Sequence, residues 1–416
     1  MITDTPPATS TLTGLHRRIF AMSWAGFFFD AYTNTVLSFI SVAVIADLHL
    51  AESTYSRLVG LQLAATAAGG ILFGWLGDAV GRKKSLQYSI LLFAFGSLLT
   101  GVTHGTWMLF VARIIAGIGV GGEWGVGQTL VGETFPAVLR GRFAALLQAA
   151  SPLSIMLSSV VGSLLAPAVG WRWAMVLSAA PAVLVLIVRV WMPESPVWEA
   201  KASGGRKTER IPLREMRAML WRPPYRKTLI VVFALTTFDM FAFWIPYTWL
   251  PNYLAKERHI NVVHSLGWFM VLQTGSLLGY LTFGWVADRW GRRLTLTAYS
   301  VVLALGIFSI TLLWNRLDTQ TGLLQVAMFV TGVGTGTFSG IGPLVVENFP
   351  TEVRSTVAGF VWNVARALTF FGPVMVTGLA PLVGLSGGIS IAGVFALCVA
   401  GSAWLLPETA GRTLAA

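Results

Sequence analysis

Charged residues are scarce in this sequence. Asp, Glu, Lys and Arg make up 11% of its 416 residues, against about 25% in a soluble globular domain. A chain with so little polar cover and a mean hydropathy of +0.70 must have lipid as most of its solvent. The composition therefore argues against a soluble enzyme, a nucleic-acid-binding protein and a disordered scaffold, and it makes membrane lipid a partner.

Ligands for metals and phosphates are also missing. The single cysteine, Cys398, excludes an intrachain disulfide and a thiolate metal site. The five histidines fall in tails, loops or span ends and form no ligand pair on one helical face. A Gly-rich phosphate loop followed by Lys and Ser or Thr does not occur, so ATP-driven transport is unsupported. We therefore expect no metal, no cofactor and no nucleic-acid partner.

Long apolar runs are what the sequence has instead. A bilayer core about 30 Å thick needs roughly 20 apolar residues per helical span. Twelve such runs occur, at about 19–46, 56–77, 86–103, 107–131, 141–167, 171–192, 228–254, 265–287, 295–315, 322–346, 356–382 and 387–406. They are apolar all round rather than alternating, which predicts helices and not barrel strands. The expected fold is an all-α membrane protein with twelve transmembrane helices in two pseudo-symmetric six-helix bundles.

Basic residues give the orientation. Of the 29 Lys and Arg residues, 22 fall in the tails and loops on one side of the predicted spans and 5 on the other. By the positive-inside rule both termini are cytoplasmic in a multi-pass protein of the inner or plasma membrane. We expect a disordered cytoplasmic tail at 1–18, an N-terminal six-helix bundle at 19–192, a cytoplasmic linker at 193–227, a C-terminal six-helix bundle at 228–406 and a cytoplasmic tail at 407–416.

The two halves repeat one another. Segment 74–83, Gly-Trp-Leu-Gly-Asp-Ala-Val-Gly-Arg-Lys, returns at 284–293 as Gly-Trp-Val-Ala-Asp-Arg-Trp-Gly-Arg-Arg, an offset of 210. Glu-Thr-Phe-Pro at 133–136 returns at 347–350 as Glu-Asn-Phe-Pro, and Pro-Glu-Ser at 193–195 returns at 407–409 as Pro-Glu-Thr, both with an offset of 214. Three anchors at nearly one spacing indicate a duplicated six-helix unit.

The repeated motifs predict a conformational latch. Asp78 and Asp288 fall at helix C-termini, where the macrodipole disfavours an anion. Nearby arginines and the N-terminus of another helix could compensate them in one conformation and withdraw in another, while Gly74 and Gly81 permit close helix approach. The predicted latch residues are Gly74, Asp78, Gly81, Arg82, Glu133, Arg140, Gly284, Asp288, Gly291, Arg292, Glu347 and Arg354. The alternative is a solvated loop whose basic residues only set topology.

These motifs resemble the major facilitator superfamily of secondary transporters over nearly the whole chain. Phe-Asp-Ala-Tyr at 29–32 and the Gly-rich segment 113–124 are similar to its metabolite/proton symporter branches for sialate, lactate and aromatic acids. Those branches commonly carry a second acid where this chain has Thr33, so that acid's role is not carried over. The resemblance implies a transporter rather than an enzyme, with the first, fourth, seventh and tenth spans lining a central cavity.

Ionisable residues inside predicted spans are site candidates, since each costs about 2.5–3.5 kcal/mol to insert at the bilayer centre. The resemblance implies that Asp30 pairs with Arg113 and carries the coupled proton. Glu123, ten residues after Arg113 on the same helix, is interpreted as a proton-relay acid. A permanent Asp30–Arg113 ion pair and a Glu123 hydrogen-bonded between packed helices are the structural alternatives.

Substrate contacts are predicted around Arg366, whose guanidinium has no acid within a turn and so suits a carboxylate substrate. Asp239 could pair with Arg366, titrate, or bind a cation. The remaining candidate substrate-binding residues are Asn363, Asn34, Tyr247, Gln148 and Gln273. Helix-to-helix hydrogen bonding is the alternative role of the polar ones.

The sequence therefore predicts proton-coupled symport of a small organic anion, a carboxylate in the first place, by alternating access in a monomer. A proton-coupled drug or cation antiporter using Asp239 is the main alternative. A neutral-sugar symporter and a nutrient-sensing receptor that keeps the transporter fold are two further ones. The expected partners are the small-molecule substrate, protons and lipid.

Overall fold

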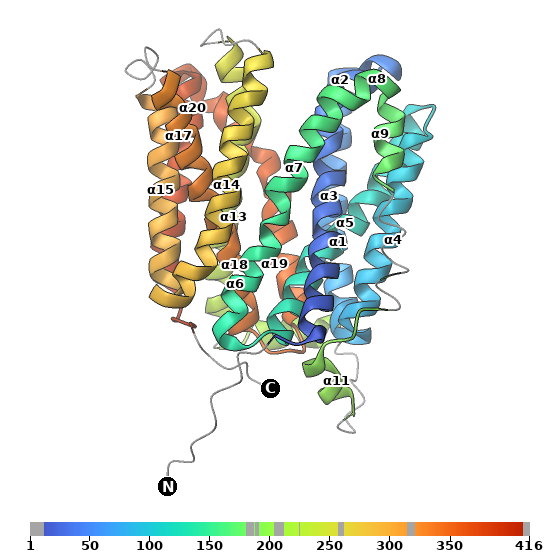
Figure 1. The fold of residues 1–416 in the computed structure, drawn as a ribbon, viewed down its shortest axis with the longest axis vertical. Coiled ribbons are helices and arrows are strands. Elements are labelled where there is room, and N and C mark those ends of the chain that lie inside the picture. The colour runs from blue at the N-terminus through green and yellow to red at the C-terminus, as the bar shows by residue number, and fades with distance from the viewer. Residues whose placement is uncertain are drawn as a thin grey trace.

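The computed structural model describes residues 12–179, 187, 191–203, 212–223, 225–256, 262–313 and 321–410, and all regular elements within them are helical. The N-terminal helices, blue to green, stand beside the C-terminal ones, yellow to red (Figure 1). Within these ranges eight helices are long and apolar enough to cross a membrane, or nine if one bent pair counts as a span. The all-α architecture of two bundles agrees with the prediction.

The N-terminal bundle begins with α1 (Gly14–Phe39) and α2 (Ser41–Asp47), which are bent by 58°. It continues with α3 (Glu52–Val80), α4 (Arg82–Gly101), α5 (Thr106–Thr134), α6 (Ala137–Gln148), α7 (Ala150–Val160), the π-helical turn η1 (Val161–Leu165), α8 (Ala166–Val169) and α9 (Trp171–Leu177). Residues 14–18, predicted as tail, are thus helical. Residues 1–11 and most of the predicted sixth span after 179 lie outside the described residues.

Two short helices belong to the predicted linker, α11 (Pro196–Ser203) and α12 (Leu213–Leu220). The C-terminal bundle comprises α13 (Tyr225–Lys256), α14 (Val262–Trp290), α15 (Arg292–Leu312), α17 (Thr321–Gly334), the 3₁₀ turn η2 (Thr335–Thr337), α18 (Phe338–Asn348), α19 (Arg354–Leu368), the 3₁₀ turn η3 (Thr369–Phe371) and α20 (Gly372–Ala403). Gly384 breaks α20 with a φ of 73°, between the two predicted spans 356–382 and 387–406.

Glycine lets the two bundles touch backbone to backbone. A Cβ on Gly74 of α3 would lie 2.5 Å from the Ser355 carbonyl oxygen of α19, and one on Gly284 of α14 would lie 2.7 Å from Cα of Arg142 in α6. The close helix approach predicted for Gly74 is therefore present, and Gly284 repeats it; at Gly81, the other glycine of that prediction, the neighbour is the Glu194 carboxylate. The bundles meet directly along α3 with α19 and α6 with α14.

Candidate functional site

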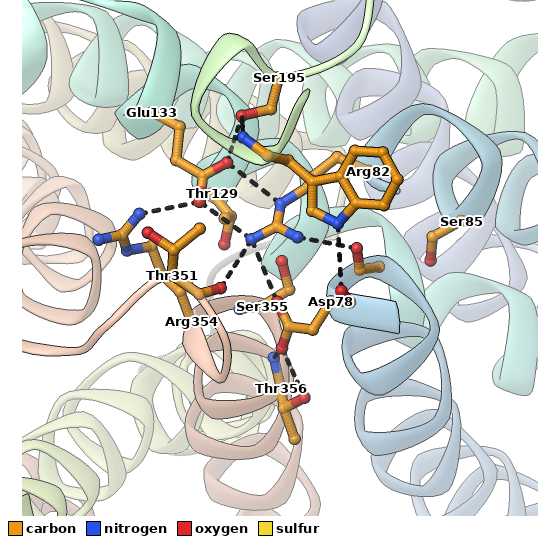
Figure 2. Close-up of polar contacts among 12 residues, drawn as sticks. Asp78, Arg82, Ser85, Thr129, Glu133, Ser195, Thr351, Arg354, Ser355 and Thr356 are labelled. Atoms are coloured by element: carbon orange, nitrogen blue, oxygen red, sulfur yellow. Dashed lines mark hydrogen bonds and ion pairs between the residues drawn. The ribbon is translucent and has the colours of Figure 1, made fainter. Parts of the chain in front are cut away.

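One end of the molecule, where α11 lies in Figure 1, gathers the repeated motifs, and we call it the motif end. Here Asp78 of α3 accepts hydrogen bonds from the backbone N–H groups of Ser355 at 3.2 Å and Thr356 at 2.9 Å, and from the Thr356 hydroxyl at 2.7 Å (Figure 2). These donors form the N-terminus of α19, in the other bundle. The predicted compensation of Asp78 by another helix's N-terminus is therefore present in this conformation.

Arg82 joins this contact to the neighbouring acids. Its Nη2 lies 3.2 Å from Asp78 Oδ1, and its guanidinium donates to both oxygens of Glu133 at 3.1 and 2.9 Å. It also donates to the carbonyl oxygen of Thr351, across the bundle interface, at 2.9 Å. Planar, bidentate geometry of this kind makes strong charge-assisted hydrogen bonds.

Glu133 is held from three sides, as Figure 2 shows. Besides Arg82, it accepts from Arg354 Nη1 of the C-terminal bundle at 2.8 Å and from the Ser195 hydroxyl at 2.5 Å. The first repeat thus crosses to the other bundle through Asp78, Arg82 and Glu133. The crossing contacts are those of Asp78 with the N-terminus of α19, of Arg82 with Thr351 and of Glu133 with Arg354. All of them must break if the bundles separate at the motif end.

The second repeat is built differently. Asp288 pairs with Arg292 of its own bundle at 2.6 Å and with Nε of Arg142, from the N-terminal bundle, at 3.4 Å. Arg292 also donates to Glu347 at 3.1 Å, while Arg140 Nη1 reaches that carboxylate across the interface at 3.7 Å. The crossing contacts here are arginine ion pairs at 3.4 and 3.7 Å and one backbone N–H contact from Arg142 to Asp288, and the Arg142 side chain is 32% exposed. All the predicted latch residues meet at the motif end, with closer crossing contacts in the first repeat.

Glu194 was not among the predicted latch residues, although its motif was recognised as a repeat. Its carboxylate accepts from the backbone N–H groups of Arg82 at 2.9 Å and Lys83 at 3.2 Å, at the start of α4. Burial raises the pKa of Glu194, and these N–H donors with that of Ser195 offset the rise only in part. Gly81, at φ 108°, leaves the space that Glu194 fills.

Glu408 repeats this arrangement in the C-terminal bundle. It accepts from the backbone N–H groups of Arg292 at 2.9 Å and Arg293 at 3.1 Å, beside Gly291 at φ 94°. Burial acts to raise the pKa of Glu408, but backbone donors, first among them Arg292 and Ala410, outweigh it and hold the pKa below its ordinary value. Glu194 and Glu408 of the two Pro-Glu motifs therefore cap the N-termini of α4 and α15, the helices that follow Gly81 and Gly291.

The central candidate site is a cavity of about 50 Å³ between the bundles, enough for a few water molecules. Asp30 of α1 and Gln148 of α6 line it from the N-terminal bundle, and Arg366 of α19 lines it from the C-terminal one. Its aromatic wall comprises Phe27, Phe243, Trp244, Tyr280, Phe338 and Trp362. Of the other predicted substrate-binding residues, Asn34, Asn363, Asp239, Tyr247 and Gln273 do not line it.

Asp30 and Arg366 face this cavity from opposite bundles without an ion pair within 4 Å. Arg366 is the charged residue that acts most strongly on Asp30, and Asp30 is the charged residue that acts most strongly on Arg366. Asp30 Oδ1 and Arg366 Nε have no hydrogen-bond partner among the described residues. The Arg366 guanidinium lies 5.6 Å from the centre of the Trp244 ring. An acid and a cation with unused hydrogen-bonding capacity therefore share one small cavity.

The expected Asp30–Arg113 pair is wrong for this conformation. Arg113 Nε donates to Gln62 Oε1 at 3.1 Å, and Gln62 Nε2 donates to Asn34 Oδ1 at 3.0 Å. Gln62 therefore takes the place that the resemblance gave to Asp30. Both Nη atoms of Arg113 lack a partner within the described part of the chain. The sequence signal for Gln62, a lone amide in the second apolar run, was missed.

Glu123 lies close to Asp30. Its carboxylate packs against Gly26, one helical turn before Asp30 on α1, where a Cβ would come within 2.9 Å of Glu123 Cδ. The charge of Asp30 acts on Glu123, and both Glu123 oxygens lack partners among the residues described. Two acids thus lie next to one another on the N-terminal side of the cavity.

Asp239 and Asn363 have other contacts. Asp239 accepts a hydrogen bond from the Thr337 hydroxyl at 2.6 Å and forms no ion pair with Arg366 among the described contacts, so that suggested pairing is wrong here. Asn363 donates to the carbonyl oxygens of Gly121 at 2.8 Å and Gly359 at 3.0 Å. It therefore links α5 to α19 rather than facing the cavity. Within the described residues no group of three or more His, Cys, Asp or Glu side chains could hold a metal ion.

The chain is similar along most of its length to known transport proteins. The family model described as Major Facilitator Superfamily matches residues 23–373 and 263–414. A protein of Haemophilus influenzae named as a metabolite transport protein is 29% identical over 395 residues, covering 94% of this chain and 96% of its own. The sialic acid transporter NanX of Escherichia coli is 26% identical over 392 residues, covering 94% and 92%.

Among solved structures, the proton:xylose symporter XylE bound to 6-bromo-6-deoxy-D-glucose aligns with a TM-score of 0.79 over 96% of this chain and 98% of its own. At 18% identity this likeness concerns the fold alone. A family match over most of the chain and two bundles of membrane-length helices joined at repeated motifs together identify the protein as a multi-pass membrane transport protein that belongs to the major facilitator superfamily.

Proposed function

We propose that the protein is a proton-coupled symporter of a small organic anion, a carboxylate, in the cytoplasmic membrane. The observation that carries the proposal is that Arg366 and Asp30 face one another across the central cavity from opposite bundles, each with a polar atom that has no hydrogen-bond partner among the residues described. A guanidinium offers a carboxylate a planar, two-point contact. Relatives include a sialic acid transporter, which is consistent with an acidic substrate.

In this proposal Arg366 binds the substrate carboxylate and Asp30 binds the proton. When Arg366 is occupied by substrate, its charge is no longer free to stabilise the Asp30 carboxylate, so proton binding to Asp30 becomes more favourable. Glu123, packed against Gly26 one turn before Asp30, relays this proton. Substrate and proton then favour each other's binding, which symport requires.

The latch supplies the conformational half of the cycle. With the motif end on the cytoplasmic side, as the excess of basic residues there indicates, the present conformation is closed to the cytoplasm by the crossing contacts of Asp78, Arg82 and Glu133. Alternating access would break these contacts while the bundles rock about the central cavity. The cavity volume of about 50 Å³ is far below that of typical ligand pockets, so the bundles must separate to admit substrate.

The alternatives have less support. A cation antiporter built on Asp239 needs that carboxylate in the cavity, whereas it accepts a hydrogen bond from Thr337 and does not line the space. A neutral-sugar symporter would share an Asp30–Arg113 pair, which is not formed here. A nutrient receptor would bind substrate without counterflow.

The test is uptake of labelled small carboxylates into proteoliposomes under an imposed pH gradient. With one proton per monovalent anion the cycle moves no net charge, and each pH unit supplies about 1.36 kcal/mol, or about tenfold accumulation. Arg366→Ala should weaken substrate binding by about 2–5 kcal/mol, the usual loss when a buried charge partner is removed. Arg366→Lys, which keeps the charge, is the matched control and should lose less.

Uptake indifferent to the pH gradient and to Arg366→Ala would reject the proposal. Binding of the acid without exchange across the membrane would favour the receptor. Accumulation of a cation that depends on Asp239 would favour the antiporter.

A further inference from the structure

The start of α13 exposes basic side chains at the level where a membrane span ends. Residues Tyr225–Trp249 of this helix are long and apolar enough to cross a membrane, and the Ile230 side chain on it is 51% exposed. An apolar side chain exposed on a span faces lipid. Arg226 and Lys227 are also exposed, four and three residues before Ile230. They therefore lie on the same helical face, one turn closer to the bilayer surface.

Two residues of the preceding turn extend this surface. The carbonyl oxygen of Arg222 accepts a hydrogen bond from the backbone N–H of Arg226 at 3.1 Å, so the exposed Arg222 side chain lies one further turn along the same face. The Trp221 side chain is 58% exposed, and indole rings concentrate at membrane–water interfaces. We call Trp221, Arg222, Arg226, Lys227 and Ile230 the basic corner.

The basic corner is fixed by packing on both sides. The preceding helix, α12, buries Met216, which is 3% exposed, in the same apolar cluster as Leu229 of α13. Tyr225, the first residue of α13, stacks on Phe349 at the motif end, with ring centres 6.3 Å apart. Because the backbone is already held, a ligand of the basic corner would not have to order it on binding.

The cations of the basic corner have no acid to neutralise them. Arg222, Arg226 and Lys227 form no ion pair with any residue that the structure describes. By contrast Arg172, whose side chain is 31% exposed, pairs with Asp47 at 2.7 Å. The neighbouring helix α12 exposes two more arginines and one acid, Arg214, Arg217 and Glu215. The surface around the basic corner is therefore positive, and its charge is available to an external anion.

We propose that the basic corner binds the headgroup of an anionic phospholipid in the leaflet at the motif end. The guanidinium forks of Arg222 and Arg226 suit the oxygens of a phosphodiester. Trp221 lies at the interface, and the acyl chains run along the face that carries Ile230. A lipid with net negative charge is preferred over a zwitterionic one, because the basic corner offers no acid to a choline or ammonium group.

The experiment titrates the delipidated full chain in detergent with phosphatidylglycerol or phosphatidylcholine of identical acyl chains and follows binding by native mass spectrometry. The protein should bind phosphatidylglycerol about tenfold more tightly, and higher ionic strength should reduce the difference. The triple variant Arg222→Gln/Arg226→Gln/Lys227→Gln should bind the two lipids within about twofold of one another.

The matched control removes the same number of exposed cations elsewhere at the motif end. Arg17→Gln/Arg18→Gln/Lys84→Gln changes side chains at the starts of α1 and α4, and it should keep the preference for phosphatidylglycerol. Melting temperatures show whether each variant is folded. If the triple variant of the basic corner does not fold, Arg226→Gln alone gives the same comparison and should weaken phosphatidylglycerol binding about fivefold.

Equal binding of the two lipids by the unaltered protein would overturn the proposal. Equal loss of the preference in the two triple variants would also overturn it, since the basic residues would then act only through total charge. Displacement of phosphatidylglycerol by millimolar glycerol 3-phosphate would identify a site for free phosphate esters instead of lipid. None of these outcomes depends on whether the protein transports a carboxylate.

Discussion

Asp78 at the motif end and Asp30 in the centre are both buried carboxylates on helices of the N-terminal bundle, but their partners differ. Asp78 has two backbone N–H donors, one hydroxyl and one arginine. Asp30 has an arginine beyond ion-pair distance and an oxygen with no partner among the described residues. The same contrast separates Glu133, held by Arg82, Arg354 and Ser195, from Glu123, whose two oxygens have no hydrogen-bond partner in the part of the chain that the structure describes.

The two sets of buried charges therefore have different expected roles. Buried charges whose partners come from the opposite bundle stabilise one relative position of the bundles. Buried charged groups that lack hydrogen-bond partners gain stabilisation when a proton or a substrate binds to them. In the proposed cycle the motif end therefore sets which side is closed, and the central residues respond to the bound proton or substrate. Each prediction below changes one side of this comparison.

The largest effect is expected from Asp30→Asn. The protein with Asp30 should accumulate substrate about tenfold per unit of pH gradient. The amide cannot exchange a proton, so accumulation by the variant should not depend on the gradient, while exchange of labelled for unlabelled substrate continues. Uptake by Asp30→Asn that still follows the pH gradient would show that this carboxylate does not couple the proton.

The second largest effect is expected from Asp78→Asn, which should open the motif end more than a substitution in the second repeat does. Alkylation of a cysteine at Ser355 reports opening of the motif end, in a background with Cys398→Ser. The Ser355 hydroxyl has no partner within the described residues, so Ser355→Cys spares the backbone contact to Asp78. Asp78→Asn weakens a charged contact to a helix N-terminus by about 1–2 kcal/mol, which should raise the alkylation rate about 5- to 30-fold.

Asp288→Asn is the matched control for this measurement. Its crossing contacts are an ion pair with Arg142 at 3.4 Å and one backbone N–H of Arg142, fewer than the three α19 donors that hold Asp78, so its effect should be smaller. Equal effects of the two substitutions would mean that the longer contacts of the second repeat hold the motif end as strongly as those of the first.

Gly26→Ala tests the packing of Glu123 in the centre. The new Cβ would overlap the Glu123 carboxylate, and overpacking of this kind costs about 1–3 kcal/mol. Proton-driven uptake should fall, because Glu123 must move away from Asp30. Gly127→Ala on α5 is the control, since its Cβ would find only ordinary contacts at 3.8 and 4.0 Å. Equal uptake by the two variants would contradict a role for the position of Glu123.

The smallest effect is a pH dependence of stability with opposite signs at the two Pro-Glu motifs. The pKa of Glu408 is lowered on folding, so its contribution is present above the ordinary pKa and is lost as pH falls through the lowered one. The pKa of Glu194 is raised, so the folded state binds the proton more tightly and stability falls as pH rises from the ordinary to the raised value.

Melting temperatures of the protein, Glu194→Gln and Glu408→Gln across mildly acidic pH measure this difference. Glu194→Gln should remove the downward contribution with rising pH, and Glu408→Gln the upward one. The same slope in all three proteins would contradict the opposite shifts.

Much of the fold could be predicted because its signals are long or repeated. Apolar runs of membrane length mark the helices, and the motif around Asp78 returns around Asp288 with the same spacing. The compensation of Asp78 by a helix N-terminus followed from the macrodipole alone, without knowledge of which helix supplies it. Both the two-bundle fold and the approach of Gly74 to the opposite bundle agree with these predictions.

The central site was less predictable, because its pairings depend on helix rotation and on the conformational state. The resemblance implied a pair of Asp30 with Arg113, but the amide of Gln62 on α3 takes the contact with Arg113 of α5. Likewise Asp239 was placed in the correct span, yet its partner Thr337 lies in a 3₁₀ turn that no sequence period announces. Side chains that could face either neighbour cannot be assigned from spacing alone.

The central claim is that the two bundles open at one end while closing at the other around the cavity. Spin labels measure it directly in a Cys398→Ser background. One pair replaces the exposed Lys84 and Leu294 at the motif end, and the other replaces the exposed Val42 and Leu323 toward the opposite end. Addition of a transported carboxylate at acidic pH should shift the two distance distributions in opposite directions. Distances that stay fixed, or that rise and fall together, would contradict alternating access.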